Sequence, residues 1–147
     1  MTKAHCRSRS IIVAALIAVI SVVGGCASLG ERHTLGLFTS VRPVLESNCV
    51  HCHGPSRLAH MPAFADTREL ANLIGSANWI VPGHPERSRF LAVVRFADNQ
   101  PGAMPPTGHA ISRSEVEALR AWIAAGALLP AGAPVVFTPR GEGPRGR

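Results

Sequence analysis

Apolar residues recur at helical spacing along much of the chain, and no segment shows the alternation expected of a half-buried strand. The last helical segment is the best defined, because Ser112 and Glu115 form a capping-box pattern and Gly126 suits the end of a helix. Its apolar stripe consists of Val116, Leu119, Trp122 and Ile123. The pattern predicts a small all-α domain.

Shorter helices are expected upstream. The first begins near Thr34, and Pro43 should interrupt or bend it. The second is capped at Asp66-Thr67 and stopped by Gly75, and its inward face carries Leu70, Leu73 and Ile74.

A third upstream helix is expected from Pro85 to about Arg95, because proline suits the first helical position. Its inward residues are Phe90, Leu91 and Val94. A Gly- and Pro-rich loop follows over residues 99–108 and leads to the last helix.

The N-terminal segment has the features of an export signal. An almost unbroken apolar run, Ile11–Val23, follows positive charges on Lys3, Arg7 and Arg9, and it is short for a membrane span. The run ends in Val23-Gly24-Gly25-Cys26, which resembles the lipobox of bacterial lipoproteins. The resemblance implies cleavage before Cys26 and acylation of that residue, so that lipid anchors the protein to a membrane. An uncleaved signal anchor and ordinary secretion are the alternatives, and all three export the domain.

The predicted organisation is therefore a signal peptide over residues 1–25, a tether over 26–33, a folded domain over 34–129 and a flexible tail over 130–147. The tail is rich in Pro, Gly and Arg, although Val135-Val136-Phe137 could dock on another surface. We expect an exported protein on the periplasmic or extracytoplasmic face of a bacterial membrane. Ala27, in place of an acidic residue after Cys26, favours the outer membrane by the enteric sorting rule.

Charge and cysteine content both change when the signal is removed. The net charge falls from +6 to +3, which gives no indication of nucleic-acid binding. Cys6 leaves with the signal and Cys26 is acylated, so only Cys49 and Cys52 remain in the folded part. An exported pair would ordinarily suggest a disulfide, but the residue after Cys52 changes that interpretation.

The sequence Cys49-Val50-His51-Cys52-His53 carries the candidate chemistry. Thiols three residues apart on a helical turn point to the same side, so both can reach the vinyl groups of one porphyrin and form thioethers. His53 then lies beneath the ring, where one imidazole nitrogen can bind iron while the other donates to a carbonyl. The motif predicts one covalently bound haem c.

Two rival interpretations of the cysteine pair are weaker. A thioredoxin-like redox pair requires a βαβ setting, and half of a zinc site requires a second Cys/His pair at ligand spacing. His51 lies between the cysteines and should face away from the ring as a solvated side chain.

Met104, 51 residues after His53, is the candidate for the second axial ligand. A thioether is a soft ligand suited to haem iron, and Pro105 and Pro106 stiffen the loop that must hold it. Met61 also precedes a proline, but eight residues after His53 is a short distance for reaching the opposite haem face. The remaining alternatives are a five-coordinate iron or ligation by His60, His84 or His109.

These elements, taken in order, resemble the planctomycete-type cytochrome c domain within the class I fold. The resemblance spans most of residues 38–127 and includes Val41-Arg42-Pro43-Val44-Leu45, the cysteine motif, Asp66-Thr67-Arg68, Ile80 to Ser88, Met104-Pro105-Pro106 and Ile111-Ser112. It implies a helical domain wrapped around one haem, with Cys49 and Cys52 as attachment points and His53 and Met104 as axial ligands. His84 departs from the pattern, where a more usual capping residue is expected.

The leading functional prediction is an electron carrier that exchanges single electrons with a redox protein donor and acceptor and is not itself an enzyme. A haem-based sensor or small-ligand binder is a second possibility, which requires Met104 to leave the iron. A third is an electron-entry subunit of a membrane dehydrogenase or oxidase complex.

Overall fold

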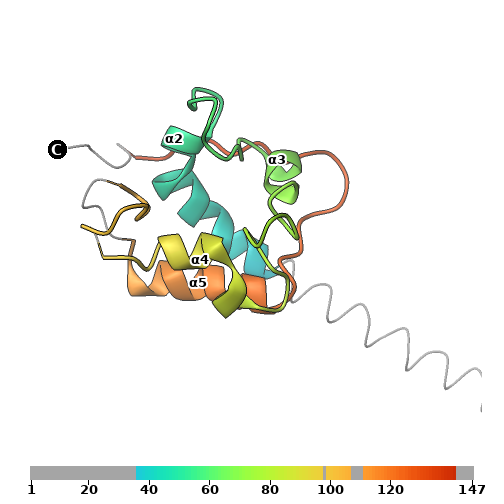
Figure 1. Cartoon of the computed structure of the whole chain (residues 1–147). Coiled ribbons are helices and arrows are strands. Elements are labelled where there is room, and N and C mark those ends of the chain that lie inside the picture. Colours follow the sequence, from blue (N-terminus) through green and yellow to red (C-terminus); the bar gives the residue numbers. More distant parts are fainter. Residues whose placement is uncertain (1–35, 98, 107–110, 142–147) are drawn as a thin grey trace, which may run out of the picture. The chain divides into compact units, whose positions relative to one another are not determined.

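The computed structural model describes residues 36–97, 99–106 and 111–141, which belong to one compact unit. These residues form short helices joined by long loops, and in them β-structure is limited to isolated bridges (Figure 1). The prediction of an all-α fold is confirmed. The helical segments are residues 36–48, α2 (Val50–His53), α3 (Thr67–Ala71), the 3-10 helix η1 (Pro85–Arg87), α4 (Arg89–Val93) and α5 (Arg113–Ala124).

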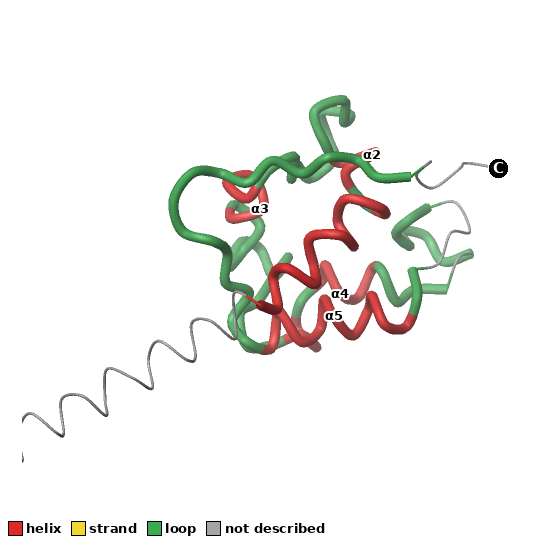
Figure 2. The backbone as a smooth tube through the Cα atoms, turned by 180° about the vertical axis from the view of Figure 1, so that it is seen from behind, coloured by secondary structure: helices red, strands yellow, loops and turns green. Residues whose placement is uncertain are grey.

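The core forms where the helix over residues 36–48 meets α5, with α4 lying alongside α5 (Figure 2). Phe38 packs against Trp122 with ring centroids 6.4 Å apart. Other fully buried side chains in this core are Val41, Leu45, Leu70, Ile80, Leu91, Leu119 and Ile123. Burial of each such side chain contributes about 1.5–3 kcal/mol, so packing rather than helix propensity holds these short helices.

The last helix follows its sequence signals closely. The Ser112 hydroxyl accepts from the Glu115 N–H, and the Glu115 carboxylate accepts from the Ser112 N–H, which completes the predicted capping box. Gly126, just beyond α5, has φ = +102°, a conformation that disfavours a side chain.

Two predictions about the upstream helices are wrong in part. Pro43 does not interrupt the helix over 36–48, because Pro43 and Thr39 are both exposed and water can replace the missing backbone hydrogen bond. The predicted helix from Pro85 to Arg95 is split at Ser88, whose backbone is extended. The buried Ser88 hydroxyl accepts from the Val81 N–H and donates to the His84 carbonyl, so this residue ties the break to the preceding loop.

The segment over residues 131–141 differs from the predicted flexible tail. It crosses α3 and α2 (Figures 1 and 2), and the Thr67 N–H donates to the Val135 carbonyl. Phe137 is only 2% exposed and packs against Phe38, with centroids 6.3 Å apart. The docking suggested for Val135-Val136-Phe137 therefore takes place on this domain itself, through Phe137. Residues 142–147 lie outside the described residues.

Charge pairs add to the contact between this segment and the helix over 36–48. Glu46 is fully buried and forms ion pairs with Arg42 and Arg140. Burial alone would raise the pKa of Glu46, but the Arg42 hydrogen bond, the Thr138 N–H and both positive charges hold it below its ordinary value. A depressed pKa stabilises the fold above the unfolded-state pKa, and that stabilisation is lost as pH falls through the folded-state pKa.

Replacing Phe137 by Ala is expected to lower the free energy of unfolding by about 3–5 kcal/mol, because it leaves a cavity against Phe38. Val136 is 63% exposed, so Val136→Ala is the matched control and should change stability by less than about 0.5 kcal/mol. Denaturant unfolding of the haem-loaded protein measures both. Equal, small effects would show that the segment contributes nothing to the fold.

Candidate functional site

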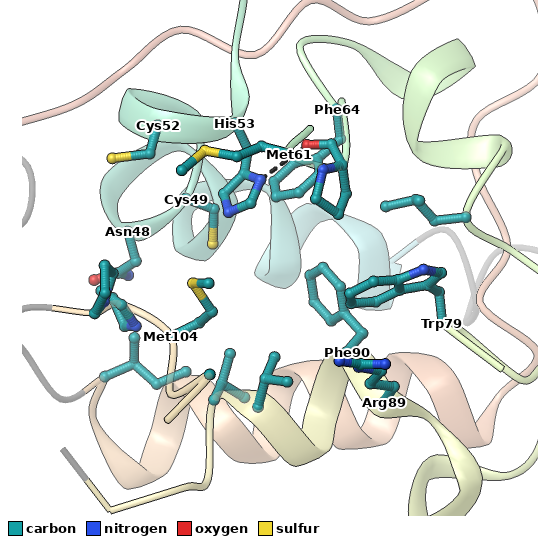
Figure 3. A pocket seen from close by; sticks show the side chains of 18 residues that line it. Asn48, Cys49, Cys52, His53, Met61, Phe64, Trp79, Arg89, Phe90 and Met104 are labelled. Carbon is teal, nitrogen blue, oxygen red and sulfur yellow. Dashed lines mark hydrogen bonds between the residues drawn. The ribbon is translucent and has the colours of Figure 1, made fainter. Parts of the chain in front are cut away.

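The cysteine motif lies where the helix over residues 36–48 meets α2. The N–H groups of Cys52 and His53 both donate to the Cys49 carbonyl, which closes one helical turn. Cys49, Cys52 and His53 all line one cavity of about 180 Å³, and Figure 3 shows the Cys49 sulfur and the His53 ring pointing into it, with Cys52 at its edge. Both cysteines are free thiols. The structure therefore brings together the three motif residues singled out in the sequence.

The His53 ring is fixed in orientation. Its Nδ1 lies 2.8 Å from the Pro62 carbonyl oxygen, and since a carbonyl can only accept, Nδ1 carries the proton. The ring also stacks on Phe64, with centroids 4.8 Å apart and planes at 13°. Nε2 is thereby left as the nitrogen with a lone pair for a metal. The sequence predicted a carbonyl partner but could not identify Pro62.

Met104 reaches the same cavity from the other side. Its N–H donates to the carbonyl of Val93 at 2.9 Å, so the loop is tied to the end of α4. Figure 3 shows the Met104 sulfur turned into the cavity on the wall that faces His53. Gly102, with φ = +86°, gives the loop a turn that other residues rarely adopt.

The alternative ligands are placed differently. Met61 lines the cavity too, but it lies beside His53 rather than across from it (Figure 3). His60 and His84 are exposed and do not line the cavity, and His84 pairs with Glu86. His109 lies outside the described residues. His51 Nε2 lies 3.0 Å from the Arg140 carbonyl oxygen, so this ring is engaged by the C-terminal segment.

The cavity walls are largely apolar. They include Phe64, Leu73, Phe90, Val93, Val94 and Ile111. Burial, with smaller effects from Glu115 and Cys52, raises the pKa of the Cys49 thiol to about 12. This thiol is therefore neutral at physiological pH, as an apolar environment requires. Asn48, at the cavity edge, is held by the Val44 carbonyl and the Glu115 carboxylate.

Two lining residues, Trp79 and Arg89, had little or no sequence signal for the site. In sequence, a lone tryptophan is compatible with cofactor contact or with simple core packing, and nothing local distinguishes Arg89 from the other arginines. The Arg89 guanidinium lies 5.0 Å from the centre of the Trp79 ring. No grouping of three or more His, Cys, Asp or Glu side chains suited to a metal ion occurs within the described ranges.

These features fit a flat, mostly apolar macrocycle with a central iron. The cavity offers thiols for attachment, an imidazole nitrogen with a free lone pair and a facing thioether, all within apolar walls. A small helical fold with this site is that of a cytochrome c domain, a class that binds haem c, lies outside the cytoplasm and carries electrons between redox partners.

The family model described as cytochrome c oxidase, cbb3-type, subunit III matches residues 37–123, and the chain belongs to this family. Comparisons with curated proteins and with solved structures gave no match. Among the described residues, no helix combines the length and apolar character needed to cross a membrane.

Proposed function

We propose that this protein is a monohaem c-type cytochrome that passes single electrons between a donor and an acceptor protein. In this proposal Cys49 and Cys52 attach the haem, and His53 and Met104 are its axial ligands. The observation that carries it is the placement of His53 and Met104 on facing walls of one cavity that both cysteines line. The bound haem supplies a one-electron ferric/ferrous couple.

The residues around the two ligands support a rigid, six-coordinate site. The Pro62 carbonyl and the Phe64 ring orient His53, and the Val93 carbonyl ties down the Met104 backbone. Ligands held in place on both sides need little rearrangement when the iron changes charge. A haem iron bound by both side chains would have no open position for a substrate, which favours a carrier over a sensor or an enzyme.

Met104 is preferred to Met61 because of where the two side chains lie. A ligand opposite His53 would have to come from the facing wall of the cavity, and Figure 3 shows Met104 on that wall and Met61 next to His53. Met61 is also held in a tight turn by its N–H, which donates to the Leu58 carbonyl. We assign Met61 to packing around His53.

An electron-entry subunit of a membrane oxidase is a second candidate, and the family description, a subunit of a cbb3-type oxidase, favours it. We propose the planctomycete type of cytochrome c for the subgroup, on the order of the motifs from Val41-Arg42-Pro43 to Ile111-Ser112. Carrier and subunit share the same haem chemistry and differ in how long the partner stays bound.

The proposed function is tested on the wild-type protein matured in an export-competent bacterial host. The haem should remain with the polypeptide after acid-acetone extraction, and the reduced protein should show a low-spin spectrum unchanged by carbon monoxide. Loss of the haem on extraction would rule out a c-type cytochrome. Ready binding of carbon monoxide would favour the sensor.

We also propose that Cys26, which lies outside the described residues, is lipid-modified and anchors the domain to the membrane. Support comes from Val23-Gly24-Gly25-Cys26 at the end of the apolar run. The intact mass of the mature protein should correspond to a chain that starts at Cys26 and carries acyl groups. Cys26→Ser should release the domain from membranes, whereas an unmodified N-terminus in a competent host would contradict the anchor.

A further inference from the structure

The His53 ring is oriented by a loop without regular secondary structure. This loop connects α2 to α3, and it holds the ring through the Pro62 carbonyl and the Phe64 ring. Most side chains in its earlier part, over residues 55–60, are exposed. The orientation of His53 therefore depends on what fixes the later part of the loop.

The end of this loop is paired with the C-terminal strap, which we define as residues 135–140. The Thr67 N–H donates to the Val135 carbonyl, and the Val135 N–H donates to the Thr67 hydroxyl, both at 3.0 Å. The Phe137 N–H donates to the Ala65 carbonyl at 2.9 Å. An antiparallel bridge lies between these bonds. The strap thus holds the chain directly beyond the part of the loop that contacts the ring.

The other end of the strap is anchored to the helical segments that carry the cysteine motif. The Arg140 N–H donates to the Glu46 carbonyl at 2.9 Å, and the Arg140 side chain pairs with the buried Glu46 carboxylate. The Arg140 carbonyl accepts from Nε2 of His51, in α2, at 3.0 Å. Between the two ends, the Phe137 ring packs on Phe38. Figures 1 and 2 show the strap passing across α2 and α3.

We propose that the C-terminal strap positions His53. It joins the turn that carries the His53 backbone to the loop that orients the His53 ring, so the two supports of the ring cannot move apart. Nε2 then stays directed into the cavity, and an imidazole held in this way is a better iron ligand. Phe137 is the positioning residue, because among residues 135–140 it is the buried one. This inference rests on the proposed haem function.

The hydrogen bond from Nδ1 of His53 to the Pro62 carbonyl reports this positioning. While the bond holds, the Nδ1 proton exchanges with solvent only when the loop opens locally, so its exchange rate measures how often the ring is released. A core substitution outside the strap and the loop lowers the stability of the whole domain but leaves this local opening unchanged.

Exchange of the His53 Nδ1 proton, followed by NMR in the reduced, haem-loaded protein, tests the proposal. In Phe137→Ala the exchange should be roughly tenfold or more faster than in the wild type, because the strap loses its buried anchor. Leu119→Ala is the matched control for lost stability, since Leu119 is fully buried on α5, outside both the strap and the loop. That variant should exchange within about twofold of the wild type.

Thr67→Val tests the pairing even if Phe137→Ala fails to mature. It keeps the size of a buried side chain and removes the hydroxyl that accepts from the Val135 N–H, so exchange should rise roughly fivefold. Val136→Ala, at an exposed position on the strap, should leave the rate unchanged.

Equal exchange rates in Phe137→Ala and Leu119→Ala, or an unchanged rate in Thr67→Val, would overturn the positioning role of the strap. A chain that never acquires haem would instead overturn the proposed function, and with it this inference. The spectrum of the purified protein separates the two failures before any exchange is measured.

Discussion

Replacing both Cys49 and Cys52 by Ala is expected to abolish covalent haem. The two thiols that line the cavity are the attachment points in our proposal, and no other cysteine occurs in the described residues. Acid-acetone extraction of the purified double variant should therefore leave a colourless polypeptide. Haem that stays with the chain after extraction would contradict the assignment.

The single replacements are expected to be intermediate. One thioether should still hold the haem, but maturation should be less efficient and the yield lower. His51→Ala is the matched control, since His51 lies between the cysteines in sequence while its ring contacts the Arg140 carbonyl instead of the cavity. Its haem content should equal that of the wild type, which separates loss of attachment from general disturbance of α2.

Loss of the haem should also weaken the fold. The cavity is lined by apolar side chains from the loop over residues 61–64, from α4 and from the loop around Met104, so without haem these surfaces lack a packing partner. The double variant should accordingly unfold at a lower denaturant concentration than the wild type. An unchanged midpoint would mean that the domain does not depend on its cofactor for stability.

The features predicted correctly from sequence depend on residues close together in the chain. The capping box joins Ser112 to Glu115, and Gly126 lies two residues after the end of α5. The motif from Cys49 to His53 likewise closes within one turn. Local patterns of this kind set the backbone geometry through contacts within one turn, so they can be recognised from the sequence alone.

The features that were missed, or were seen only as possibilities, depend on distant residues. The sequence suggested that Val135-Val136-Phe137 could dock but not where, because the burial of Phe137 is set by Phe38, far away in sequence. The break at Ser88 depends on the N–H of Val81, in the loop before η1, which donates to the Ser88 hydroxyl. Nothing local distinguishes these positions from an ordinary tail or helix residue, and only the folded arrangement gives them a role.

The candidate site shows the same division. Its attachment motif and the need for a carbonyl behind His53 follow from chemistry, but the identity of that carbonyl, Pro62, depends on how the loop folds back. The sequence does not distinguish Arg89 from the other arginines. Only the folded structure, in which its guanidinium stacks over the Trp79 ring, places it among the residues that line the cavity. The choice between Met104 and Met61 rested on sequence separation, and the cavity adds a spatial reason for the same choice.

Replacing Met104 by Ala is expected to remove one axial ligand and change the haem in several measurable ways. The weak near-infrared band of the oxidised protein, which arises from sulfur-to-iron charge transfer, should disappear. A thioether favours ferrous iron, so the equilibrium constant for reduction should fall by about tenfold or more, equivalent to ~59 mV for a one-electron couple. The open position should then bind carbon monoxide or cyanide.

Met61→Ala is the matched control, because Met61 also lines the cavity but lies beside His53. This variant removes a side chain of the same size and chemistry and should keep the band, the six-coordinate spectrum and the resistance to carbon monoxide. If Met61→Ala loses the near-infrared band while Met104→Ala keeps it, the ligand assignment is reversed. If neither variant changes it, neither methionine is the axial ligand.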